Sequence, residues 1–162
     1  MPDLVGPSTD LHTPWLEAHK EWGPGLHEDG FGLTATDEVD TPTGFATWIA
    51  RLTSSDDTVC RWIVEDGNVL GAIALRHTDT DYTSWAGHIG FGIRPSARRR
   101  GLASWALRHI LDEARAHGMN RVLAVCALDN IASARTIENA GGVFEEIRET
   151  PYGPARRFWI EL

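Results

Sequence analysis

The sequence has only two cysteines, Cys60 and Cys126, and they lie far apart in separate apolar runs. Neither belongs to a CxxC motif and no histidine follows at zinc-like spacing, which disfavours both a disulfide framework and a structural zinc site. The sequence also lacks any run of about 18 consecutive apolar residues, the length that a membrane-spanning helix requires. Its first residues, Met1-Pro2-Asp3, show no signal peptide. We therefore expect a cytoplasmic protein without a metal and without a membrane partner.

Positive charge is scarce as well: 15 Lys and Arg residues stand against 23 Asp and Glu residues, which gives a formal net charge of -8. Binding to duplex nucleic acid depends largely on neutralising phosphates, so this balance argues against a nucleic-acid partner. Arg98, Arg99 and Arg100 form a local exception. With 162 residues, 42% of them hydrophobic, the chain is long enough to bury a core, and we expect a single domain over residues 1–162.

Two periodicities alternate along the chain and predict an α/β protein with a mixed sheet. Apolar residues at helical spacing follow Thr13-Pro14 and Thr41-Pro42, and each Thr-Pro pair is typical of a helix start. Two apolar runs joined through Asp66-Gly67 predict an antiparallel hairpin, and residues 143–162 predict another. A polar turn over residues 78–81 is expected to lead into the next strand.

Residues 85–103 form an alternating apolar run that breaks and then continues as a helix, which we interpret as strand, phosphate-binding loop and helix. In the strand, His88, Gly90 and Gly92 share one face, where missing side chains allow close approach. Gly101 opens the helix, whose first four amides have no partner inside it. These amides, the helix dipole and the neighbouring arginines suit a pyrophosphate group.

Two motifs in the second half of the chain resemble those of the GNAT acyltransferases. Arg98-x-x-Gly101-x-Ala103 resembles the acyl-CoA-binding signature, in which Gln or Arg is followed by two residues, Gly, one residue, and Gly or Ala. Asn130-x-x-Ser133, followed by Glu138 and Gly141, resembles the next strand-to-helix segment of the ribosomal-protein alanine acetyltransferase branch. The resemblance covers roughly residues 85–162 and implies transfer of an acetyl group from acetyl-CoA to an amine.

The resemblance also implies a fold: a mostly antiparallel central sheet with flanking helices and one splayed parallel pair of strands. Residues 121–126 would pair in parallel with the strand before the loop, because a helix connects the two. In the family, pantetheine enters the opening between these strands. The residues expected to bind the cofactor are Ile93, Arg94, Arg98, Arg99, Arg100, Gly101, Leu102, Ala103, Asn130 and Ser133.

Ser133 and His88 are the candidate catalytic residues. Many family members carry a Tyr that protonates the departing thiolate, but Ile137 stands at that position. In the ribosomal-protein branch, which also lacks the Tyr, a Ser matching Ser133 is the usual proposal for stabilising the thiolate. The attacking amine must be unprotonated, and His88, aligned with a frequent family Glu, could accept its proton directly or through water.

Other assignments remain open. Asn130 and Ser133 could serve only to cap a helix, and His88 could be a surface or core-edge residue. Rival bases lie in the acidic loop after the first helix: Glu28, Asp29 and Glu38. Cys126 is more simply a small buried hydrophobe than a nucleophile.

The acceptor is expected to be an amine-bearing small molecule or a peptide or protein N-terminus, because the acidic loop favours a cationic substrate. A catalytically silent acyl-CoA-binding or sensing domain is the alternative. A nucleic-acid module built on Arg94 and Arg98 to Arg100 is disfavoured by the net charge. In similar chains the terminal hairpin joins dimers, which makes a homodimer possible.

Overall fold

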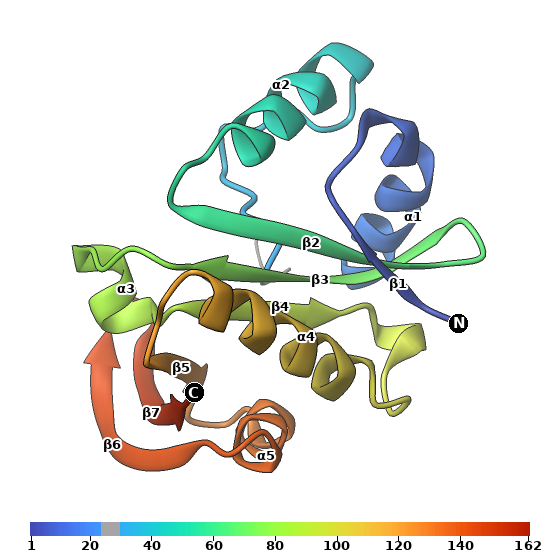
Figure 1. Cartoon of the computed structure of the whole chain (residues 1–162). Helices are drawn as coiled ribbons and strands as arrows, with labels where there is room; N and C mark the ends of the chain where they lie inside the picture. The colour runs from blue at the N-terminus through green and yellow to red at the C-terminus, as the bar shows by residue number, and fades with distance from the viewer. Residues whose placement is uncertain (24–29) are drawn as a thin grey trace. The chain divides into compact units, whose positions relative to one another are not determined.

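The computed structural model describes residues 1–23 and 30–162. Seven strands form one sheet in the order β1-β2-β3-β4-β5-β7-β6, with helices flanking it (Figure 1). Strands β4 and β5 pair in parallel, whereas the pairs β1/β2, β5/β7 and β6/β7 are antiparallel. The predicted mixed α/β fold with one parallel pair is therefore confirmed.

The strands are β1 (Asp3–Val5), β2 (Thr58–Glu65), β3 (Asn68–Arg76), β4 (Ile89–Ile93), β5 (Arg121–Ala127), β6 (Val143–Thr150) and β7 (Gly153–Glu161). The α-helices are α1 (His12–Trp22), α2 (Pro42–Thr53), α3 (Asp81–Ala86), α4 (Leu102–Ala116) and α5 (Ile131–Asn139). Two short 3-10 helices are η1 (Thr9–Leu11) and η2 (Pro95–Ala97). The described chain divides into two compact units, residues 1–74 with 91–102 and residues 75–90 with 103–162, and the expectation of a single domain stays a prediction.

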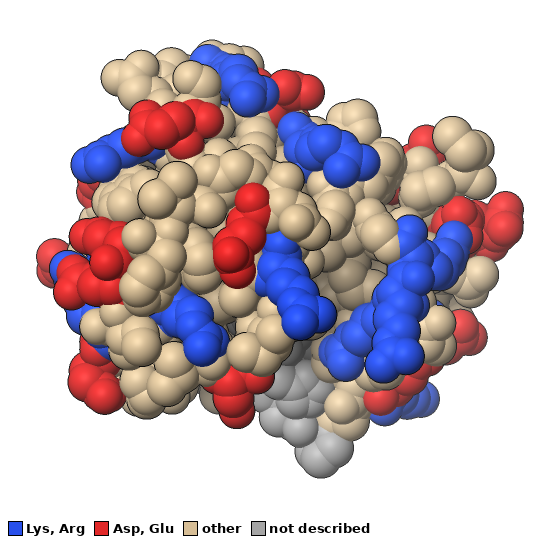
Figure 2. Space-filling view, turned by 90° about the horizontal axis from the view of Figure 1, so that it is seen from below, with Lys and Arg blue, Asp and Glu red and all other residues tan. Residues whose placement is uncertain are grey.

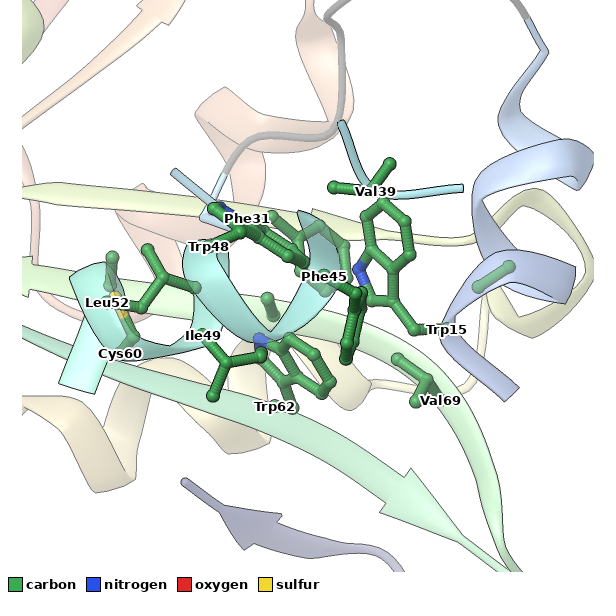
Figure 3. Packing of buried hydrophobic residues seen from close by; sticks show 13 residues of the cluster. Trp15, Phe31, Val39, Phe45, Trp48, Ile49, Leu52, Cys60, Trp62 and Val69 are labelled. Atoms are coloured by element: carbon green, nitrogen blue, oxygen red, sulfur yellow. The ribbon is translucent and has the colours of Figure 1, made fainter. Parts of the chain in front are cut away.

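An aromatic core holds the first unit together (Figure 3). Trp15 of α1, Phe45 and Trp48 of α2 and Trp62 of β2 are each no more than 1% exposed. The ring centroids of Trp15 and Trp48 lie 4.8 Å apart, and those of Trp48 and Trp62 lie 5.8 Å apart, both in tilted arrangements. Aromatic pairs avoid a face-to-face stack, and burial of these large rings stabilises the unit.

The two Thr-Pro pairs have different outcomes. Thr41 caps α2 as predicted, because its hydroxyl accepts a hydrogen bond from the Gly44 N–H at 3.0 Å. The prediction for α1 was wrong: the helix begins at His12, so Thr13 lies inside it. The preceding 3-10 turn, capped by Ser8, runs directly into α1 and moves its start towards the N-terminus.

Two glycines in the first unit allow backbone geometries that other residues would not. The predicted hairpin between β2 and β3 turns at Asp66 and Gly67, whose φ angles of 52° and 79° suit a tight two-residue turn. A Cβ atom on Gly71 of β3 would lie 2.3 Å from the carbonyl oxygen of Gly92 in β4. Glycine is therefore required at position 71 for the two strands to pair.

Helix α3, in the second unit, begins at the last residue of the predicted polar turn, after the non-helical residues 78–80, and takes the place of the first residues of the predicted strand. The Thr83 N–H donates to the Thr80 hydroxyl at 3.2 Å, and the Thr80 N–H donates to the Thr83 hydroxyl at 2.8 Å. This capping box starts a helix that overrides the strand-like pattern of Trp85 and its neighbours. Strand β4 consequently begins only at Ile89.

The remaining elements of the second unit follow the prediction. Strand β5 lies between β4 and β7, with Ala124 opposite Ile89 on one side and Phe158 on the other. The terminal hairpin of β6 and β7 is present, and β6 forms the end of the sheet. Over residues 1–23 and 30–162, no helix is both long enough and apolar enough to cross a membrane.

Candidate functional site

The predicted order of strand, loop and helix is confirmed at β4, η2 and α4. Gly101, immediately before α4, has a φ of 75°, and nothing lies within 4 Å of where its Cβ would be. Glycine is therefore favoured here by backbone conformation and not by lack of space. Arg99 has a φ of 64°, an uncommon conformation for a residue with a side chain. Two residues in the left-handed backbone conformation, Arg99 and Gly101, thus form the turn that precedes α4.

The three arginines of this loop differ in what they contact. The Arg98 Nε donates to the carbonyl oxygen of Ile93 at 2.9 Å, and Arg100 forms an ion pair with Glu65 at 2.7 Å. The guanidinium of Arg100 lowers the pKa of the Glu65 carboxyl below its usual value. The Arg99 side chain is exposed, and none of the residues that the structure describes pairs with it. Arg99 therefore differs from Arg98 and Arg100, whose side chains are held by other residues of the protein.

Glu21, in the last turn of α1, holds the segment between β4 and the loop. Its carboxylate accepts hydrogen bonds from Arg94 at 2.9 and 3.2 Å, from the Ser96 N–H at 2.6 Å and from the Ser96 hydroxyl at 2.8 Å. Burial raises the pKa of Glu21, but the hydrogen bonds from Ser96 and Arg94 outweigh it and leave the pKa below its usual value. Sequence reasoning missed Glu21. Its signal was an acidic residue at a helix C-terminus, where the helix dipole disfavours it.

The main-chain groups expected to pair with pantetheine have partners within the protein. The Ile93 carbonyl accepts the Arg98 hydrogen bond, and the Arg94 N–H donates to the Leu70 carbonyl of β3 at 2.8 Å. A cofactor that used the Arg94 N–H would have to replace its bond to Leu70, whereas the Ile93 carbonyl oxygen has a second lone pair that can accept another hydrogen bond.

In the second unit, Asn130 and Ser133 lie at the start of α5. The Asn130 Oδ1 accepts a hydrogen bond from the Ser133 N–H at 3.1 Å, so Asn130 is the N-cap of the helix. Ser133 is half-buried in the first turn. Ile137, at the position of the family Tyr, is 1% exposed and belongs to the core. The start of α5 therefore presents a hydroxyl but no phenol.

His88 is buried, with 6% of the residue exposed, and both of its ring nitrogens are hydrogen-bonded. The Leu123 N–H donates to Nδ1 at 2.8 Å, and Nε2 lies 2.8 Å from Oδ1 of Asp79. Sequence reasoning anticipated neither partner, because both bonds depend on which segments the fold brings together.

The structure describes only some of the other candidates for a catalytic role. Glu28 and Asp29 lie outside the described residues, and Glu38 is exposed in the loop before α2. Cys126 is 8% exposed, and burial raises the pKa of its thiol, so the thiol is neutral at pH 7 and is a poor nucleophile. In the part of the chain that the structure describes, no cluster of three or more His, Cys, Asp or Glu side chains could hold a metal ion.

The predicted site residues fall into two groups. Each group lies within one compact unit. The first unit contains Ile93, Arg94, Arg98, Arg99, Arg100, Gly101 and Leu102, and the second contains His88, Ala103, Asn130 and Ser133.

The surface of the molecule carries charges of both signs. Figure 2 shows a face on which basic and acidic side chains are interspersed, with basic side chains gathered in one part of it. With a net charge of -8, the chain carries no overall excess of positive charge.

Three solved structures illustrate the proteins that this chain is similar to. RimJ of Mycobacterium smegmatis, in complex with CoA-disulfide, matches with a TM-score of 0.79 and 15% identity over 99% of this chain and 81% of its own. RimL, a ribosomal alpha-N-protein acetyltransferase in complex with coenzyme A, matches with a TM-score of 0.77 and 13% identity over 99% and 94%. The microcin self-immunity acetyltransferase MccE, in complex with acetyl-CoA and AMP, matches with a TM-score of 0.72 and 12% identity over 99% and 92%. At these identities the likeness shows a shared fold.

Sequence comparison gives a more specific result. No curated protein matches the chain by sequence. The model of the acetyltransferase (GNAT) domain, however, matches residues 31–143, which is more than half of the chain. The match includes the Arg98–Ala103 and Asn130–Ser133 motifs from which the resemblance was inferred. The chain therefore belongs to the GNAT acetyltransferase family.

Proposed function

We propose that this protein transfers an acetyl group from acetyl-CoA to a primary amine by direct attack within a ternary complex. The observation that carries the proposal is the glycine-containing turn at Arg98–Gly101, which leads into the N-terminus of α4 in a chain of the GNAT family. A helix N-terminus offers unpaired amides and a favourable dipole to a pyrophosphate. The complexes of MccE with acetyl-CoA and of RimL with coenzyme A, which share the fold, support the same cofactor.

The reaction requires few protein groups. The amine lone pair attacks the thioester carbonyl carbon, the C–N bond forms, the C–S bond breaks, and the proton lost from nitrogen balances the one gained by the CoA thiolate. Holding the two reactants together and polarising the carbonyl would supply most of the acceleration. The proposed roles are pyrophosphate binding for Arg98–Ala103, pantetheine binding for Ile93 and Arg94, and contact with the thioester for Asn130 and Ser133.

Ser133 is the proposed group for stabilising the departing thiolate. Its hydroxyl lies in the first turn of α5, where the helix dipole also favours negative charge, and Ile137 cannot supply the proton of a phenol. We expect Ser133→Ala to lower kcat by roughly tenfold or more and to weaken the affinity for acetyl-CoA by a smaller factor, because its main role is at the departing thiolate. Single-turnover acetyl transfer and calorimetry separate the two quantities. Undiminished transfer in the variant would remove Ser133 from the mechanism.

The acceptor is proposed to be an amine, either on a small molecule or at a peptide or protein N-terminus. The fold shared with RimL, a ribosomal alpha-N-protein acetyltransferase, supports the second possibility. The test is release of free CoA thiol from acetyl-CoA in the presence of small amines and of peptides with free or blocked N-termini. Release that requires a free amine supports the proposal. Tight acetyl-CoA binding without release for any acceptor would instead support a silent acyl-CoA-binding domain.

Assembly and location extend the proposal. Strand β6 ends the sheet with three exposed apolar residues, Val143, Phe144 and Ile147, which supports a homodimer formed through the terminal hairpin. We also propose that the protein acts in the cytoplasm.

A further inference from the structure

We propose that His88 is a positioning residue that fastens the start of β4 to β5, and that it is not the general base of acetyl transfer. The second half of this statement rests on the proposed function, because the question of a general base arises only if the protein transfers an acetyl group to an acceptor. The first half rests on the hydrogen bonds of His88 and is independent of the reaction.

The hydrogen bonds determine which nitrogen of a neutral His88 ring carries the proton. A neutral imidazole has one nitrogen that donates and one that accepts. A main-chain N–H can only donate, so the Leu123 N–H, 2.8 Å from Nδ1, requires the lone pair to be there. The proton of neutral His88 is therefore on Nε2, where it is donated to the Asp79 carboxylate 2.8 Å away. Both partners select the same tautomer.

A base needs a lone pair that faces its substrate, and this ring has none to offer. Nε2 already carries its proton. If Nδ1 accepted a proton, its new N–H would point at the N–H of Leu123, and two buried donors would face each other without an acceptor. Proton transfer through water meets the same obstacle, because the bond to Leu123 must break first.

The position of His88 explains what the ring does instead. Its main-chain N–H donates to the Leu123 carbonyl at 2.7 Å, so His88 satisfies both main-chain polar groups of Leu123, one through its backbone and one through its ring. The next residue, Ile89, forms the parallel register with Ala124. The ring thus replaces a main-chain acceptor at the point where the parallel pairing starts.

Contacts of Gly87 and Arg76 hold the backbone around His88 in place. Gly87 has a φ of 84°, and a Cβ there would lie 2.8 Å from the Leu123 carbonyl oxygen, so only glycine allows the approach. The His88 carbonyl accepts the Arg76 N–H at 2.7 Å, and the Arg76 guanidinium donates to the Gly87 carbonyl at 3.1 Å. The fastened strands lead along the chain into the Arg98–Gly101 loop and into Asn130.

Two substitutions separate a positioning role from a base. In His88→Asn, the side-chain oxygen occupies the place of Nδ1 and can accept the Leu123 N–H, but it cannot take up a proton at neutral pH. His88→Leu keeps the bulk and loses the acceptor. We expect His88→Asn to keep kcat within about threefold of the wild type, whereas His88→Leu raises the KM for acetyl-CoA. A base would cost both variants the roughly 10²–10⁴-fold in kcat typical of lost proton transfer, and that result would overturn the proposal.

A second measurement is independent of turnover. Nitrogen NMR of the His88 ring should show an unprotonated Nδ1 and a protonated Nε2 at neutral pH. The Leu123 amide should exchange its hydrogen slowly in the wild type and in His88→Asn, and at least tenfold faster in His88→Leu. A protonated Nδ1 would overturn the proposal. If His88→Leu does not fold, the ring tautomer and His88→Asn still decide it. If no amine is acetylated, the proposed function fails while the NMR result stands.

Discussion

At the scale of single residues, Asn130 caps α5 and is also proposed to contact the cofactor, and substitution can separate the two roles. Asn130→Asp keeps the side-chain oxygen that accepts the Ser133 N–H, so the stability of the protein should change little. Asn130→Ala should cost about 1 kcal/mol in the free energy of unfolding, as expected for loss of an N-cap. If the Asn130 amide also contacts the cofactor, both variants should bind acetyl-CoA more weakly. Urea unfolding and calorimetry measure the two effects, and wild-type affinity in Asn130→Asp would confine the residue to capping.

Glu21 links stability to pH at the same scale. Because its folded-state pKa is lowered, its contribution is fully present above the unfolded value of 4.5 and is lost as the pH falls through the folded value. In Glu21→Gln, the side-chain NH2 group, which is a hydrogen-bond donor, would face a donor of Arg94 or Ser96. We expect it to lower the free energy of unfolding by about 1 kcal/mol at pH 7, and the difference should vanish in acid.

The control is Glu17→Gln, because Glu17 is exposed on the same helix. It should leave the free energy of unfolding within about 0.5 kcal/mol of the wild type at every pH. A difference between Glu21→Gln and the wild type that persists in acid would contradict the assignment.

At the scale of elements, the two ends of α4 offer a matched comparison. Gly101 precedes the helix with a φ of 75° and Gly118 follows it with a φ of 79°, and neither has an atom within 4 Å of its missing Cβ. Gly101→Ala and Gly118→Ala should therefore each cost roughly 1–2 kcal/mol through backbone strain alone. Only Gly101→Ala should weaken acetyl-CoA binding, measured by calorimetry. Equal affinities in the two variants would remove the loop from the cofactor site.

Elements were predictable where local signals agreed. Thr41-Pro42 and the helical spacing that begins at Phe45 indicated the same helix, and α2 forms there. Helix α3 was missed because its capping box uses Thr83 at the position usually held by Glu or Gln, and because alternation after it favoured a strand. The wrong start of α1 has a similar cause, since η1 supplies the first turn before Thr13.

At the scale of the whole molecule, topology was more predictable than contacts. The helix between β4 and β5 required their parallel pairing, so the sheet class followed from element order. The bonds that shape the site join residues far apart along the chain: 35 residues separate His88 from Leu123, and 73 separate Glu21 from Arg94. No local pattern encodes such pairs, because they exist only once the fold has brought the segments together.

Assembly also belongs to this scale. Val143, Phe144 and Ile147 on β6 are 67%, 51% and 51% exposed. If the hairpin joins two copies, Ile147→Lys should shift the protein from dimer to monomer in sedimentation at fixed concentration, because a charge would be buried in the interface. Glu149→Gln, on the same strand, should leave the sedimentation unchanged. A wild-type protein that is monomeric at every concentration would contradict the proposal.

The hydrogen bonds from Arg94 and Ser96 to Glu21 have a further consequence for the energetics of cofactor binding. A loop that is ordered only by its ligand loses conformational entropy at the moment of association, and the affinity falls accordingly. Here a carboxylate from a distant helix immobilises the approach to the loop during folding, before a ligand arrives. Preorganisation of this kind shifts the entropic cost from binding to folding. Weakening the hydrogen bonds to Glu21 should therefore make the entropy of cofactor binding more unfavourable while leaving the enthalpy of binding nearly unchanged.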